Sequence, residues 1–95
     1  MNDSNPLVGR LSIFKTEPGL YDYEMTCEGQ DLLVGGGFNS IVAAIEAGAD
    51  ITGPVTALEV AYRGIVAGTY PLRRLAVDAE AIARHAVETY AAVMS

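Results

Sequence analysis

An eight-residue segment in the first third of the chain constrains its fold most strongly. Residues 21–28 read Tyr-Asp-Tyr-Glu-Met-Thr-Cys-Glu, so apolar and polar side chains alternate with a period of two. In an extended strand, alternate residues project from opposite faces. The segment therefore predicts a strand with one buried face and one row of exposed carboxylates. The apolar face comprises Tyr21, Tyr23, Met25 and Cys27, and the acidic face comprises Asp22, Glu24 and Glu28.

The flanking segments extend this strand into a three-stranded antiparallel β-meander. Alternation over residues 10–16 predicts a first strand, and the Glu-Pro-Gly-Leu sequence at residues 17–20 is typical of a turn. The second strand then covers residues 20–28. A further turn at residues 29–31 leads to a short third strand over residues 32–36. Hydrophobic alternation gives this meander one apolar face.

Helical periodicity dominates the rest of the chain. A helix is predicted over residues 40–47, capped by Asn39 or Ser40 and ended by Gly48. Apolar residues at helical spacing predict a second helix over residues 77–94.

Residues 54–67 are compatible with two structures. As a helix, the segment has an apolar stripe, and Glu59 precedes Arg63 by four residues, which suits a helical ion pair. We prefer this interpretation. As strands, residues 56–68 echo the first half of the chain, since residues 24–29 resemble residues 59–64. The alternative fold is therefore a pair of duplicated ββα units.

The preferred fold class is α+β, with the meander packed against two or three helices. We expect one small domain over residues 1–95, with residues 1–8 as a loose leader. No apolar run is long enough to span a bilayer, and a single cysteine suits the reducing cytoplasm.

The net charge of −6 is concentrated in the first half of the chain. Residues 1–50 hold eight acidic and two basic side chains, which gives −6, whereas residues 51–95 hold four of each, which gives zero. This balance argues against direct binding of nucleic acid, which requires basic groups opposite the phosphates. It favours a partner protein with a basic surface.

Catalytic chemistry has little support in the sequence. Cys27 and His85 are the one cysteine and the one histidine, but Cys27 falls on the predicted core face and His85 lacks an obvious orienting carboxylate. The glycines at residues 35–37 precede a helix start and could hold a phosphate, although they match neither nucleotide-binding glycine motif. We therefore expect no enzyme activity, no metal and no cofactor.

The acidic strand face is the strongest candidate for a binding surface. Alternate carboxylates along a strand lie about 6.6 Å apart, which is close to the spacing of phosphates along a nucleic-acid strand. Size and charge are similar to those of small acidic inhibitors of nucleic-acid machinery, such as anti-CRISPR proteins. The sequence thus predicts an acidic inhibitor or adaptor, and the alternatives are a phosphate-binding domain using residues 35–37 and a structural homodimer or larger homo-oligomer. The predicted partner-binding residues are Phe14, Glu17, Asp22, Glu24, Glu28 and Asp31.

Overall fold

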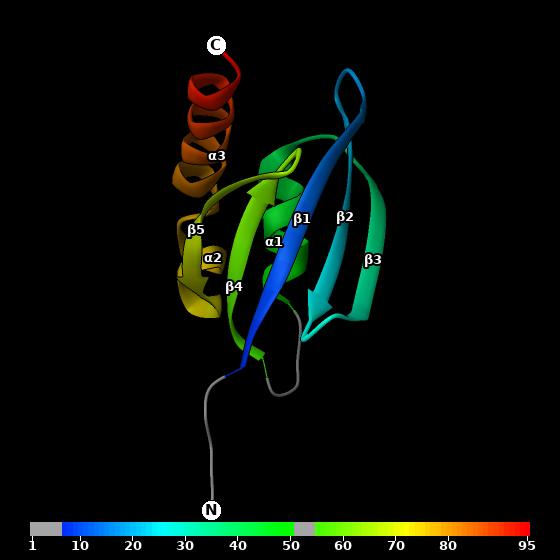
Figure 1. Cartoon of the computed structure of the whole chain (residues 1–95). Coiled ribbons are helices and arrows are strands. Elements are labelled where there is room, and N and C mark those ends of the chain that lie inside the picture. Colours follow the sequence, from blue (N-terminus) through cyan, green and yellow to red (C-terminus); the bar gives the residue numbers. More distant parts are fainter. Residues whose placement is uncertain (1–6, 51–54) are drawn as a thin grey trace, which may run out of the picture.

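Two β-hairpins flank a central strand in this protein, and helices pack against one side of the resulting sheet (Figure 1). The computed structural model describes residues 7–50 and 55–95. The elements follow one another in the order β1 (Leu7–Glu17), β2 (Leu20–Cys27), β3 (Gln30–Phe38), α1 (Ile41–Ala49), β4 (Val55–Tyr62), β5 (Ile65–Pro71), α2 (Leu72–Val77) and α3 (Ala79–Met94).

The sheet is mixed and has five strands in the order β3-β2-β1-β4-β5. The central strand β1 runs parallel to β4, and every other neighbouring pair is antiparallel. The β2–β3 and β4–β5 hairpins therefore lie on opposite sides of β1 and run in opposite directions. A two-fold axis normal to the sheet through β1 would produce this arrangement. The α+β class is confirmed, and the sheet is larger than the predicted three-stranded meander.

The predicted helix over residues 54–67 is wrong, and the strand alternative for residues 56–68 is confirmed. The β2–β3 and β4–β5 hairpins each turn at a residue pair with positive φ at both positions, as type I′ turns require. These are Glu28 (53°) with Gly29 (80°), and Arg63 (52°) with Gly64 (89°). The resemblance between residues 24–29 and 59–64 is therefore that of two equivalent hairpins. Glu59 pairs with Arg10 of β1 rather than with Arg63, because β4 lies beside the central strand.

Substitution of Gly64 by alanine distinguishes the hairpin turn from the predicted helix, because the change in the free energy of unfolding has opposite signs in the two structures. At φ 89°, alanine is strained, so we expect Gly64→Ala to lower the free energy of unfolding by about 1–2 kcal/mol. In the interior of a helix, the same change would raise it by about 1 kcal/mol. Urea unfolding of the variant and the wild type measures the difference, and a more stable variant would contradict the turn.

Several predicted boundaries also change. Ser40 caps α1, since its Oγ accepts a hydrogen bond from the backbone N–H of Ala43 at 3.0 Å. Gly48 does not end this helix but lies within it, buried against β1. The helix predicted over residues 77–94 is α3, which α2 precedes. Of the predicted leader, residues 7 and 8 belong to β1, and residues 1–6 lie outside the described residues.

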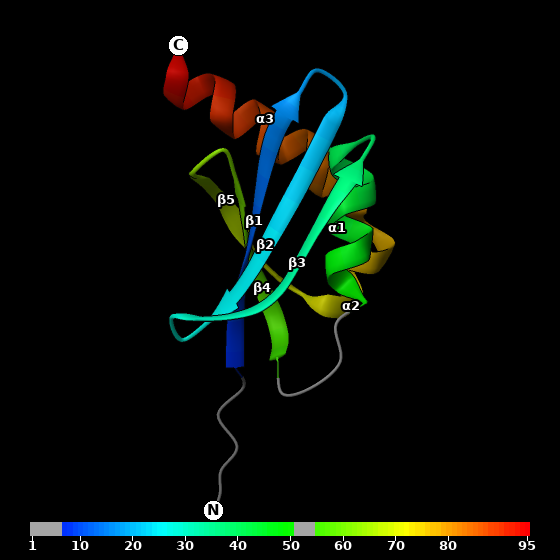
Figure 2. The same cartoon turned by 90° about the vertical axis from the view of Figure 1, so that its right-hand side faces the viewer.

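The core lies between the sheet and the helices. The side view shows α1 and α2 on the same side of strands β1, β2 and β3 (Figure 2). Tyr23 and Met25 are buried there, as the alternation in β2 predicted. Beyond the sheet, α3 continues past the ends of β4 and β5, where Tyr90 stacks edge-on against Tyr62 with ring centroids 5.5 Å apart. The largest fully buried side chains are Leu11, Ile13, Met25, Ile45, Leu58, Val60 and Leu75.

Candidate functional site

The side of the sheet opposite α1 is the candidate site, and we call it the uncovered face. In Figure 1 the strands lie in front of α1, so the reader looks onto this face. The polar positions of the alternating strands β1 and β2 lie here because their apolar positions enter the core. Cross-strand neighbours on this face are Phe14 with Asp22, Ser12 with Glu24, Arg10 with Thr26, and Arg10 with Glu59.

The structure brings three of the six predicted partner-binding residues together. Phe14 lies directly opposite Asp22, and Glu24 follows two residues later on the same face. The side chain of Phe14 is 42% exposed although it is aromatic, and Glu24 is also exposed. Burial of an exposed aromatic side chain is a common source of binding energy in protein interfaces.

The other three predicted residues lie around this group rather than in a single row. Glu28 is the first residue of the β2–β3 turn, so the carboxylate row ends with β2. Glu17 lies opposite Leu20, next to the turn that joins β1 to β2. Asp31 belongs to β3, opposite Thr26, and not to the turn that was predicted over residues 29–31.

Asp22 has a structural partner that sequence reasoning missed. Its Oδ1 accepts a hydrogen bond from the backbone N–H of Gly37 at 3.2 Å. A Cβ atom at Gly36 would lie 2.7 Å from the same oxygen, so the absence of a side chain there lets the carboxylate approach the backbone. The glycine segment and the acidic strand, which the sequence presents as separate signals, are therefore one structural unit. A bound anion would need the backbone N–H of Gly37 as a hydrogen-bond donor, and this N–H already donates to the carboxylate of Asp22.

Glu59 is an acidic residue of the uncovered face that sequence analysis placed on a helix. Its Oε1 accepts a hydrogen bond from Arg10 Nε at 2.7 Å, across the parallel β1–β4 pair. The pair is solvent-accessible and contributes little to stability, about 0–1 kcal/mol. Its effect on the site is electrostatic, since Arg10 offsets the charge of Glu59. Asp22 and Glu24 make no ion pair within the described ranges, so they carry the excess negative charge of this face.

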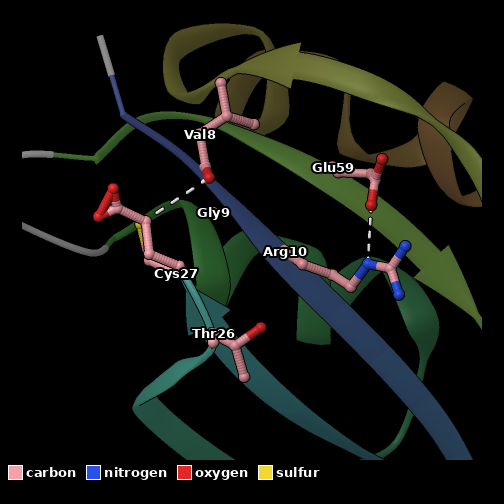
Figure 3. Close-up of a pocket in the computed structure, with 8 residues that line it drawn as sticks. Val8, Gly9, Arg10, Thr26, Cys27 and Glu59 are labelled. Atoms are coloured by element: carbon pink, nitrogen blue, oxygen red, sulfur yellow. Dashed lines mark hydrogen bonds and ion pairs between the residues drawn. The ribbon is translucent and has the colours of Figure 1, made fainter. Parts of the chain in front are cut away.

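A shallow pocket of about 400 Å³ adjoins the face at the β2–β3 turn (Figure 3). Val8, Arg10, Thr26 and Glu59 contribute to its lining. Cys27 also lines it and is partly buried rather than fully enclosed in the core, with its Sγ 3.8 Å from the carbonyl oxygen of Val8. The backbone carbonyl therefore partners the thiol.

His85 lies elsewhere, on α3. It is exposed, lines a different depression beside Tyr70 and Arg74, and lies 3.5 Å from the hydroxyl of Thr89. In the part of the chain that the structure describes, no three His, Cys, Asp or Glu side chains are grouped to hold a metal ion.

Comparison of the chain with protein families, with characterised proteins and with solved structures finds no match. Within residues 7–50 and 55–95, no helix is both long enough and apolar enough to cross a membrane.

Proposed function

We propose that this protein is a non-enzymatic interaction module that docks the uncovered face on a basic surface of a partner protein. The observation that carries the proposal is the exposed ring of Phe14 beside the carboxylates of Asp22 and Glu24, on a sheet face opposite the helices. The aromatic ring would supply apolar contact area, and the carboxylates would select basic partners.

The partner surface follows from this chemistry. It presents arginine or lysine side chains to Asp22 and Glu24 and a shallow apolar recess to Phe14. Asp22 suits this role because its bond to Gly37 fixes the carboxylate before binding, so less side-chain entropy is lost on association. A nucleic-acid-binding groove is one surface of this kind, and blocking such a groove would make the protein an inhibitor.

The test separates the charge of the face from the net charge of the chain. Asp22→Asn with Glu24→Gln removes two charges and leaves an amide oxygen to accept the bond from Gly37. The partner is first captured from the native organism, and its affinity is then measured with purified components by calorimetry at low and high salt. We expect the double variant to bind at least about tenfold more weakly at low salt and to depend less on salt.

The matched control carries the same change in net charge on the helices. Glu46→Gln in α1 with Glu88→Gln in α3 alters two exposed carboxylates away from the uncovered face. This control is expected to bind like the wild type, whereas Phe14→Ala is expected to weaken binding by about 30-fold or more, as for a central interface residue. Equal affinities for the two charge variants would contradict the proposal.

A further inference from the structure

A depression on the helix side of the sheet lies between β5, α2 and α3. Its volume of about 300 Å³ is at the lower end of the range for small-molecule sites, roughly 300–1,000 Å³. Tyr70 contributes to it from β5, and the cross-strand neighbour of Tyr70 is the buried Leu58. The depression is therefore on the opposite side of the sheet from the uncovered face. The residues that line it are Tyr70, Arg74, Asp78, Ala81, Ile82 and His85.

Basic side chains are concentrated in the segment that forms most of this depression. Residues 73–85 contain three arginines and the one histidine of the chain, against two acidic side chains. With a neutral imidazole the segment carries a charge of +1, whereas the rest of the chain carries −7. A small anion is therefore attracted to this segment and repelled by the rest of the molecule.

Arg74 is held at the depression by an ion pair. Its Nε lies 2.7 Å from Oδ2 of Asp78, the residue between α2 and α3. Asp78 is the N-cap residue of α3, but its side chain accepts no capping hydrogen bond, because the carboxylate is directed to the guanidinium instead. A guanidinium has five N–H donors, and a single carboxylate accepts two of them in the usual fork geometry. Arg74 therefore keeps donors for a second anion.

His85 and two apolar residues of α3 complete the depression. Nε2 of His85 lies 3.5 Å from the hydroxyl of Thr89, one turn further along the helix, which leaves Nδ1 as a second polar atom of the ring. Ala81 and the buried Ile82 supply apolar surface. The depression thus combines cationic donors with an apolar wall, as small-molecule sites commonly do.

We propose that this depression binds a monocarboxylate with a short apolar chain. The carboxylate contacts the guanidinium of Arg74 and the imidazole of His85, and the chain covers Ala81 and Ile82. Arginine suits this ligand because its planar fork of donors matches the geometry of a carboxylate. The site is separate from the uncovered face, so this inference does not depend on the proposed partner.

The local charges favour a monoanion over a dianion. Asp78 offsets the charge of Arg74, so a protonated His85 is the one uncompensated cation among the lining residues that the structure describes. A phosphate dianion would meet the carboxylate of Asp78 with little cationic charge to offset the repulsion. A monocarboxylate brings a single negative charge, and its apolar chain gains contact area that phosphate lacks.

Titration of the untagged protein with sodium hexanoate at constant ionic strength tests the site. His85 is the one histidine of the chain, so its imidazole proton resonances in the NMR spectrum report on this depression alone. We expect saturable shifts with a dissociation constant of roughly 1–10 mM, as for a small ligand. Acetate lacks the apolar chain and inorganic phosphate carries the higher charge, so each is expected to bind at least about tenfold more weakly. Shifts that do not saturate, or equal affinity for hexanoate and either other anion, would overturn the proposal.

A pair of charge variants separates the site from general attraction of anions. Arg74→Gln is expected to weaken hexanoate binding at least about tenfold, because it removes the guanidinium that holds the carboxylate. The matched control is Lys15→Gln, which removes the same charge from an exposed residue of β1 outside the depression and is expected to bind like the wild type. Circular dichroism and thermal unfolding check that both variants are folded. Equal losses of affinity in the two variants would overturn the proposal.

A pair of steric variants tests the depression itself without changing any charge. Ala81→Leu fills the apolar wall and is expected to weaken hexanoate binding at least about tenfold, because the chain of the ligand loses its place. Ala92→Leu makes the same change at an exposed residue near the end of α3, outside the depression, and is expected to bind like the wild type. Alanine and leucine both favour helix, so α3 is retained in both variants. Unchanged binding by Ala81→Leu would overturn the assigned site.

Discussion

Replacing Leu11 by alanine is expected to lower the free energy of unfolding by about 2–5 kcal/mol, the range for deletion of a fully buried leucine side chain. Leu11 is completely buried in the central strand β1, where it lies between Met25 of β2 and Val60 of β4. Its methyl groups also face Gly48 of α1. Truncation therefore leaves a cavity where the two hairpins and the first helix meet.

The contact with Gly48 makes a second measurement possible. A Cβ atom at Gly48 would lie 2.9 Å from Cδ2 of Leu11, and the buried leucine has little room to move. Gly48→Ala is therefore expected to lower the stability of the wild type by up to about 2 kcal/mol, because overpacking outweighs the gain in helix propensity. In a Leu11→Ala background the clash is gone, and the same change is expected to raise stability by about 1 kcal/mol.

Urea unfolding of the four proteins in this double-mutant cycle measures the coupling. Leu32→Ala is the matched control, because it makes the same chemical change at a leucine that is 44% exposed. This variant is expected to cost less than about 1 kcal/mol of unfolding free energy. If Gly48→Ala had the same effect with leucine and with alanine at position 11, the packing of α1 on β1 described above would be wrong.

The local features of the sheet could be predicted from the sequence, whereas its long-range pairing could not. The alternation in β2 is set by neighbouring residues, so the burial of Tyr23 and Met25 followed from residue order alone. The pairing of β1 with β4 joins residues such as Leu11 and Val60, which are far apart in the chain. Valine, leucine and tyrosine over residues 55–62 fit both a helical stripe and a buried strand, and the pairing with β1 stabilises the strand.

In the candidate site too, local features could be predicted from the sequence and long-range contacts could not. Alternation placed Phe14, Asp22 and Glu24 on one face, because the two strands of a hairpin share a register fixed by their turn. The bond from Gly37 to Asp22 depends on how β3 twists and ends, which periodicity does not encode. Glu59 reached the face through the β1–β4 pair, so it was missed together with that pair. The Arg-Gly pair at residues 63–64 resembles the Glu-Gly pair at residues 28–29, and this resemblance indicated a second hairpin turn.

Tyr62 should make the protein sensitive to alkaline pH. Burial raises the pKa of the Tyr62 phenol above its ordinary value of 10.0, and the nearby charge of ionised Tyr21 acts in the same direction, while Arg63 opposes both. Burial likewise raises the pKa of Tyr23. The folded state therefore favours the neutral phenols. Their contribution to stability is complete below about pH 10 and is lost as the pH rises from there through the higher pKa values of the folded state.

Two substitutions at Tyr62 separate its packing from its ionisation. Tyr62→Ala is expected to cost about 3–5 kcal/mol at neutral pH, because it removes a buried ring that contacts Tyr90 of α3. Tyr62→Phe keeps the ring and lacks the ionisable hydroxyl, so its stability should decline less steeply than that of the wild type above pH 10. Urea unfolding between pH 7 and 11 measures both effects. Parallel loss of stability in the wild type and in Tyr62→Phe would show that ionisation of this phenol is not coupled to unfolding.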